Sequence, residues 1–122
     1  MILGSLSLAI AAVIVAGTWG LLRDALASSL DAVPAGVDPG SVRKHLASLT
    51  GVASVHDLHI WPMSTTEIAL TCHLSMPDGH PGDAFLMTAA KDLETRFGIG
   101  HSTLQIETGA QVTCELAPDH VV

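Results

Sequence analysis

Residues 67–76 read EIALTCHLSM, and this stretch decides the fold. Its apolar residues occupy every second position and alternate with smaller or polar residues. The first set is Ile68, Leu70, Cys72, Leu74 and Met76, and the second is Ala69, Thr71, His73 and Ser75. Successive side chains of a strand point to opposite faces, so this alternation predicts a strand with one face buried in a core.

The segments on either side of this strand predict the rest of one small domain. Residues 52–63 are rich in strand-forming residues, and residues 101–108 alternate again, with Leu104 and Ile106 inward. A helix is expected to begin after Asp38 and to end at residues 50–51, and a second helix over residues 86–97 ends at Gly98. The order helix, strand, strand, helix, strand predicts a ferredoxin-like α+β domain with both helices on one face of the sheet.

The N-terminal stretch has a different character. Residues 2–22 contain no charged side chain, and as a helix they would extend about 31 Å, enough to cross a bilayer core. Trp19 suits a membrane interface, and Arg23 places the following residues in the cytoplasm by the positive-inside rule. A signal peptide is the alternative, but the stretch lacks a charged start and a small-residue cleavage site.

We therefore expect four segments. Residues 1–32 form a transmembrane helix and its cytoplasmic extension, and residues 33–40, which are rich in proline and glycine, form a linker. Residues 41–108 form the ferredoxin-like domain, and residues 109–122 form a tail.

Composition excludes several classes of function. Twelve acidic residues against five lysines and arginines give a net charge of -7, which disfavours nucleic acid as a partner. The two cysteines cannot form the disulfide framework of a small secreted protein. The chain contains neither a nucleophile motif nor a glycine-rich phosphate loop, so we do not expect an enzyme.

The candidate chemistry is metal binding. Seven histidines are present, and His56, His73 and Glu107 fall one on each predicted strand. Two imidazoles and a carboxylate suit Zn²⁺ and related divalent ions if the sheet brings them together. His73, His101 and Glu107 are expected on the face without helices, open to solvent, a metal or a partner. The alternative is that these are unrelated surface residues.

Other candidate ligands are less clear. His59 lies three residues after His56, so in a regular strand the two would point to opposite faces and not share an ion. His101 and Cys114 could form a second, softer site if the tail folds back. Cys72 is expected to be a small core residue on the apolar face of its strand.

Four segments resemble the end of the cation diffusion facilitator transporters, which export zinc, cobalt and cadmium. They are LLRDALASSLDAVPAGVD (21–38), GVASVHDLHIW (51–61), CHLSM (72–76) and FGIGHSTLQIE (97–107). The resemblance implies a homodimer of six-helix protomers in a bilayer, with a bacterial-type inner (plasma) membrane as the expected location. Such protomers exchange Zn²⁺, or an ion such as Co²⁺ or Cd²⁺, for protons, and their ferredoxin-like cytoplasmic domain binds metal and tightens the dimer.

The resemblance also implies roles for particular residues. His56, His73 and Glu107 match a regulatory metal site of the family, and His101 and Cys114 resemble a second cytoplasmic site of some members. Asp83 and Gln105 stand where some members carry further ligands, which puts a full binuclear site in doubt.

The transport site of the family is not matched in residues 1–30. It lies on two earlier membrane helices, each with His or Asp four residues from an Asp, and we therefore expect that this chain does not transport metal alone. A membrane-tethered metal-sensing module and a secreted binding protein remain the alternatives to a transporter fragment.

Overall fold

The computed structural model describes residues 2–30 and 32–109, and these form three helices and three strands. The helices are α1 (Ile2–Ser29), α2 (Pro39–Ala47) and α3 (Asp83–Phe97), and the strands are β1 (Ser54–Pro62), β2 (Ile68–Ser75) and β3 (His101–Glu107). The order agrees with the sequence-based expectation, and the ferredoxin-like α+β class is confirmed. The main differences are that α2 ends three to four residues early and α3 begins three residues early.

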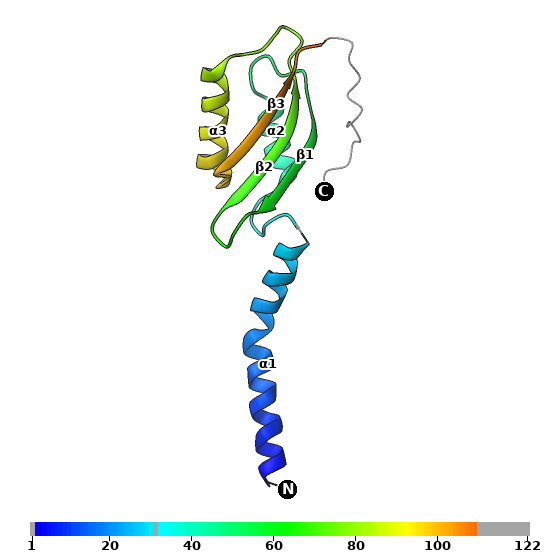
Figure 1. Cartoon of the computed structure of the whole chain (residues 1–122), viewed down its shortest axis with the longest axis vertical. Coiled ribbons are helices and arrows are strands. Elements are labelled where there is room, and N and C mark those ends of the chain that lie inside the picture. The colour runs from blue at the N-terminus through cyan, green and yellow to red at the C-terminus, as the bar shows by residue number, and fades with distance from the viewer. Residues whose placement is uncertain (1, 31, 110–122) are drawn as a thin grey trace.

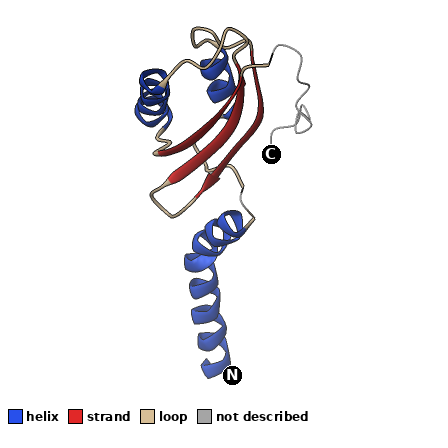
Figure 2. Cartoon of the chain, turned by 45° about the horizontal axis from the view of Figure 1, so that its top comes forward, coloured by secondary structure: helices blue, strands red, loops and turns tan. Residues whose placement is uncertain are grey.

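The strands form one sheet in the order β1-β2-β3, with β1 antiparallel and β3 parallel to β2. Helix α3 provides the crossover that parallel neighbours require. Both α2 and α3 cover the same face, and within the described residues the other face carries no helix (Figures 1 and 2). The antiparallel register places His56 opposite His73, and the parallel register places Ser75 opposite Glu107.

The core lies between the two helices and the covered face of the sheet. Helix α2 contributes Val42 and Leu46, and helix α3 contributes Ala89 and Leu93. The strands contribute Val55, Leu58, Ile60, Leu70, Cys72 and Leu74. Burying one large aliphatic side chain stabilises a fold by about 1.5–3 kcal/mol, so this apolar interior can support the domain without α1.

The ends of α2 and α3 follow from local sequence. Asp38 caps α2, because its carboxylate accepts hydrogen bonds from the backbone N–H groups of Gly40 and Ser41 at 3.2 and 3.0 Å. Gly98 ends α3 in the left-handed conformation, with φ of 71°. Its N–H donates to the Glu94 carbonyl, and the N–H of Ile99 donates to the Leu93 carbonyl, which satisfies carbonyls that the helix leaves open.

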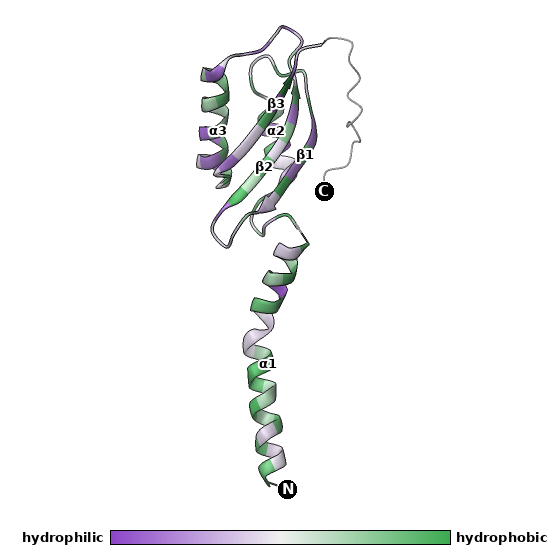
Figure 3. Cartoon of the chain, in the orientation of Figure 1, coloured by the Kyte–Doolittle hydropathy of each residue, from purple (hydrophilic) through white to green (hydrophobic). Residues whose placement is uncertain are grey.

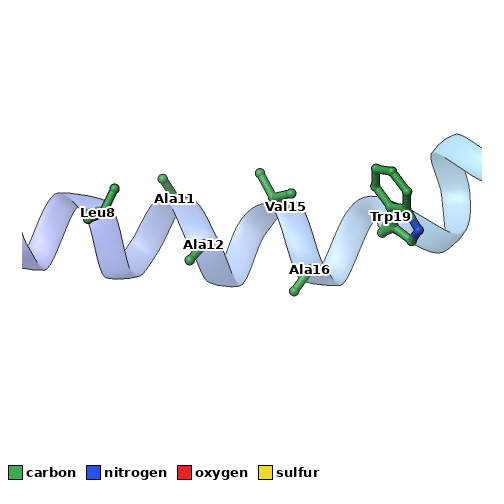
Figure 4. Close-up of a pocket in the computed structure, with 6 residues that line it drawn as sticks. All are labelled: Leu8, Ala11, Ala12, Val15, Ala16 and Trp19. Atoms are coloured by element: carbon green, nitrogen blue, oxygen red, sulfur yellow. The ribbon is translucent and has the colours of Figure 1, made fainter.

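Helix α1 stands apart from this core. Its 28 residues extend about 42 Å, and none of them is buried. Within residues 2–30 and 32–109 it is the one helix long and apolar enough to cross a membrane. Figure 3 shows mainly apolar residues along it, and Figure 4 shows side chains from Leu8 to Trp19 that border an open apolar groove.

Candidate metal centre

A β-bulge in β1 positions the side chains of the candidate site. His56 pairs with His73 and His59 pairs with Thr71, so two residues of β1 stand opposite one residue of β2. Asp57 has φ of 50°, and it is the only non-glycine residue with positive φ in the described chain. The extra residue turns His56 and His59 towards the same face. The expectation that they point to opposite faces was therefore wrong, because the strand is not regular between them.

His56, His73 and Glu107 come together at one end of the sheet. Glu107 lies between the two histidines: its Oε2 is 3.0 Å from His56 Nε2, and its Oε1 is 3.0 Å from His73 Nδ1. The two imidazole rings stand edge to face, with centroids 5.4 Å apart. The three residues lie where β1 begins and where β2 and β3 end. This end of the sheet is the one remote from α1 (Figure 1).

These donor atoms suit a divalent ion. One ligand atom from each of the three residues can be chosen so that all lie within 4.8 Å of one another. Donors around a tetrahedral Zn²⁺ at 2.0–2.1 Å are separated by about 3.3 Å, which is close to the two 3.0 Å contacts of Glu107. Small adjustments of the three side chains would therefore accommodate an ion between them.

The site is more enclosed than the sequence suggested. The His73 side chain is 11% exposed, and those of His56 and Glu107 are 16% and 21% exposed. His56 Nε2 is buried, and although it lies near Glu107 it has no partner with hydrogen-bond geometry among the described residues. Buried polar atoms are normally satisfied, and a metal ion would satisfy this nitrogen. The expectation that His73 is open to solvent was wrong: its ring lies against the Glu107 and Asp57 carboxylates and the His56 ring.

Asp57 and His59 extend the cluster. Asp57 Oδ2 is 3.4 Å from His73 Nε2, and Asp57 Oδ1 is 2.9 Å from His59 Nε2. Sequence reasoning missed Asp57 and placed His59 on the opposite face. The signal was present in the spacing of the buried residues of β1, because Val55, Leu58 and Ile60 are separated by three and then two positions. A step of three in a strand is the sign of an inserted residue.

The remaining candidate ligands lie elsewhere. His101 begins β3, six residues from Glu107 at the other end of the strand, and its Nε2 is 3.8 Å from Glu67 Oε2. The structure therefore does not bring His101 to the other three residues. Cys114 lies outside the described residues. Gln105 is opposite His73 and donates a hydrogen bond to Glu107 at 3.4 Å.

Cys72 faces the core, as expected, with 1% of its surface exposed. Burial raises the pKa of the Cys72 thiol to about 12, and the nearby Asp57 carboxylate raises it further while Arg43 opposes the shift. Cys72 is next to His73 on β2 and faces the covered side of the sheet, so it lies outside the group of His56, His73 and Glu107.

Comparison with known proteins gives one consistent result. Residues 34–109 match the family model described as "Cation efflux protein, cytoplasmic domain". The chain is 34% identical over 90 residues to the proton-coupled zinc antiporter SLC30A2 of Homo sapiens, a match that covers 74% of this chain and 24% of that protein. It is 38% identical over 96 residues to a probable zinc transporter protein of Dictyostelium discoideum, covering 78% of this chain and 18% of that protein.

The chain thus spans a quarter or less of the length of these two curated relatives. Among solved structures, the metal-bound C-terminal domain of the CzcD transporter from Cuprividus metallidurans superposes with a TM-score of 0.52 and 32% identity. That match covers 58% of this chain and 99% of the CzcD domain.

Proposed function

Since the chain belongs to the cation efflux protein family, we propose that it serves as the last membrane helix and the cytoplasmic metal-binding domain of a divalent metal efflux transporter. We propose Zn²⁺ as the ion, held by His56, His73 and Glu107. The observation that carries this proposal is the placement of Glu107 3.0 Å from a nitrogen of each histidine, on three different strands. The printed names of the relatives, which are zinc transporters, support the choice of zinc.

Three protein donors leave one position of a tetrahedral ion open. A water molecule, a residue of a second protomer or the tail could occupy it, and Cys114 is the candidate from the tail. A bound ion would link all three strands. We propose that metal binding in this way reports the cytoplasmic metal level to the transporter and stabilises a homodimer.

The membrane assignment is also a proposal. The 28-residue length of α1, its exposed apolar surface and the lack of charge before Arg23 support a helix in the lipid bilayer. We propose that residues 1–32 form this helix and its extension, residues 33–40 a linker, residues 41–108 the cytoplasmic domain and residues 109–122 a tail. An inner (plasma) membrane of bacterial type is the proposed location, and proton exchange is the proposed driving reaction of the whole transporter.

Zinc-dependent stability tests the proposed site. A ligand that binds only the folded state adds RT ln(1 + [L]/Kd), about 2.7 kcal/mol at a hundredfold excess over Kd, so zinc should raise the Tm of the full chain in detergent. His73→Ala and Glu107→Ala should each remove most of this zinc-dependent increment. Metal-free stability is measured separately, because His73 is buried and its replacement changes packing as well.

His101→Ala is the matched control, since it removes an exposed histidine from the same sheet. It should keep the wild-type zinc increment. If His73→Ala and Glu107→Ala keep the increment and His101→Ala loses it, the site lies at the other end of β3. Because zinc binds unprotonated imidazole, the increment should also shrink as the pH falls through about 6 to 7, where imidazoles take up protons.

A further inference from the structure

The two nitrogens of the His73 ring face two different carboxylates. Nδ1 is 3.0 Å from Glu107 Oε1, and Nε2 is 3.4 Å from Asp57 Oδ2. An imidazole that binds a metal through one nitrogen carries its proton on the other, and a carboxylate that accepts a hydrogen bond from this N–H group fixes the ring and makes the ligand more basic. Because the two nitrogens point in different directions, an ion shared by His73 Nδ1 and Glu107 lies away from Asp57.

The Asp57 carboxylate is itself held in place. His59 Nε2 contacts its Oδ1 at 2.9 Å, so one oxygen is engaged by His59 and the other faces His73. The backbone at Asp57 has φ of 50°, a conformation that aspartate and asparagine tolerate better than most side chains. Arg43 of α2 donates a hydrogen bond to the carbonyl of Val55, which lies two residues before Asp57. This bond connects this part of β1 to the helix layer.

We propose that Asp57 is a positioning residue for the metal site, accepting a hydrogen bond from the Nε2–H group of His73 so that Nδ1 is presented to the ion. This inference rests on the proposed function, because it assumes that His73 is a ligand. The bulge contributes to this positioning, because the inserted residue is Asp57, which supplies the carboxylate. His59 completes the arrangement by holding the second oxygen.

Asp57→Gly is the informative substitution. Glycine adopts positive φ without strain, so the bulge and the metal-free Tm should be kept or slightly raised. The carboxylate is lost, and Zn²⁺ affinity of the full chain in detergent should fall about 10- to 100-fold, measured by competition with a chelating dye. A purely structural role predicts the opposite pattern, with a lower metal-free Tm and unchanged affinity.

Asp57→Asn is the conservative counterpart. Asparagine tolerates the same backbone conformation, and its side-chain oxygen can accept a hydrogen bond from the Nε2–H group of His73 without carrying charge. It should therefore restore Zn²⁺ affinity to within a few-fold of the wild type. His59→Ala should weaken binding less than Asp57→Gly, because it removes only the contact that steadies the carboxylate. Asp78→Gly, which removes an exposed carboxylate from the loop after β2, should bind as the wild type.

Co²⁺ bound in place of Zn²⁺ gives an independent readout through its d–d absorption. The wild-type and Asp57→Asn bands should agree, and the Asp57→Gly bands should change in shape because the His73 ring is no longer fixed. Wild-type affinity and spectrum in Asp57→Gly would overturn the inference. An equal loss of Zn²⁺ affinity in Asp57→Asn and Asp57→Gly would also overturn it, because it would indicate that Asp57 acts through its charge or as a direct ligand. If His73→Ala and Glu107→Ala bind zinc as the wild type, the proposed site itself fails, which these two variants reveal independently of Asp57.

Discussion

At the scale of single residues, Asp57 has the largest influence on the candidate site. Its positive φ inserts one residue into β1 and so brings His56 and His59 to the open face. Such a conformation is uncommon for residues other than glycine and persists where the surroundings require it. Here the surroundings are Leu58, which enters the core, and the carboxylate contacts with His59 and His73.

Cys72 lies directly behind this region and gives a prediction at the same scale. Burial raises its thiol pKa to about 12, so almost no reactive thiolate is present at neutral pH. In a Cys114→Ser variant, where Cys72 is the only thiol, a disulfide reagent such as DTNB should not react with the native protein. Reaction should become complete once urea unfolds the domain. Rapid stoichiometric reaction of the native protein would contradict the buried position.

At the scale of elements, the sequence predicts regular segments well. The alternation of residues 67–76 predicted β2 almost to the residue, and the capping signals of Asp38 and Gly98 predicted the start of α2 and the end of α3. These features are encoded locally, by periodicity and by residues with special backbone preferences. The bulge in β1 was missed because a strict period of two was assumed across residues 52–63.

The contacts of the site could be predicted only in part. The sequence was enough to place His56, His73 and Glu107 on three strands. Their proximity at one end of the sheet depends on the strand order and on the parallel register of β3. Had β3 been shifted by two residues, His73 would face a different neighbour and Glu107 would lie beyond the cluster. No local pattern specifies such a register, which is set by packing across the whole sheet.

The cap of α2 gives a prediction for this element. Hydrogen bonds from the Ser41 hydroxyl and from the Ser41 and Gly40 amides lower the pKa of Asp38. Because the pKa of Asp38 is lower in the folded state, ionised Asp38 stabilises the fold at pH values above the ordinary carboxyl pKa. This stabilisation is lost as the pH falls through the folded-state pKa. Asp38→Ala should therefore lower the urea midpoint of the domain at pH 7, and the difference from the wild type should narrow towards about pH 3.

Asp78→Ala is the control for this measurement, because Asp78 is exposed in the loop after β2. It should leave the urea midpoint almost unchanged at neutral pH. A difference between Asp38→Ala and the wild type that stays constant over the same acid range would show that the carboxylate charge is not what stabilises α2.

At the scale of the whole molecule, the chain consists of an unburied apolar helix and a domain with its own core. A fragment that begins at Val33 should accordingly be soluble and should give a circular dichroism spectrum typical of a mixed α/β fold. The full chain should instead require detergent or lipid. Aggregation of the fragment with a disordered spectrum would contradict the proposed boundary.

The orientation of the helix gives a second prediction at this scale. Arg23 follows the uncharged stretch, so the domain should lie on the cytoplasmic side. Added protease should digest the domain in sealed inverted membrane vesicles and spare it in intact cells whose outer barrier has been removed. The reverse pattern would require the opposite orientation.

The parallel pairing of β3 with β2 has a consequence for the connectivity of the domain. Along the chain, 17 positions separate His56 from His73, and 34 positions separate His73 from Glu107. One ion bound to all three residues would therefore close two loops, as a pair of reversible cross-links does. The second loop contains the exposed residues Pro77 and Asp78. If a protease cut the backbone there, zinc would add ligand bonds between the two pieces to the core contacts that already join them, and a chelator would remove that added stability. Metal occupancy would therefore raise the resistance of a nicked domain to dissociation.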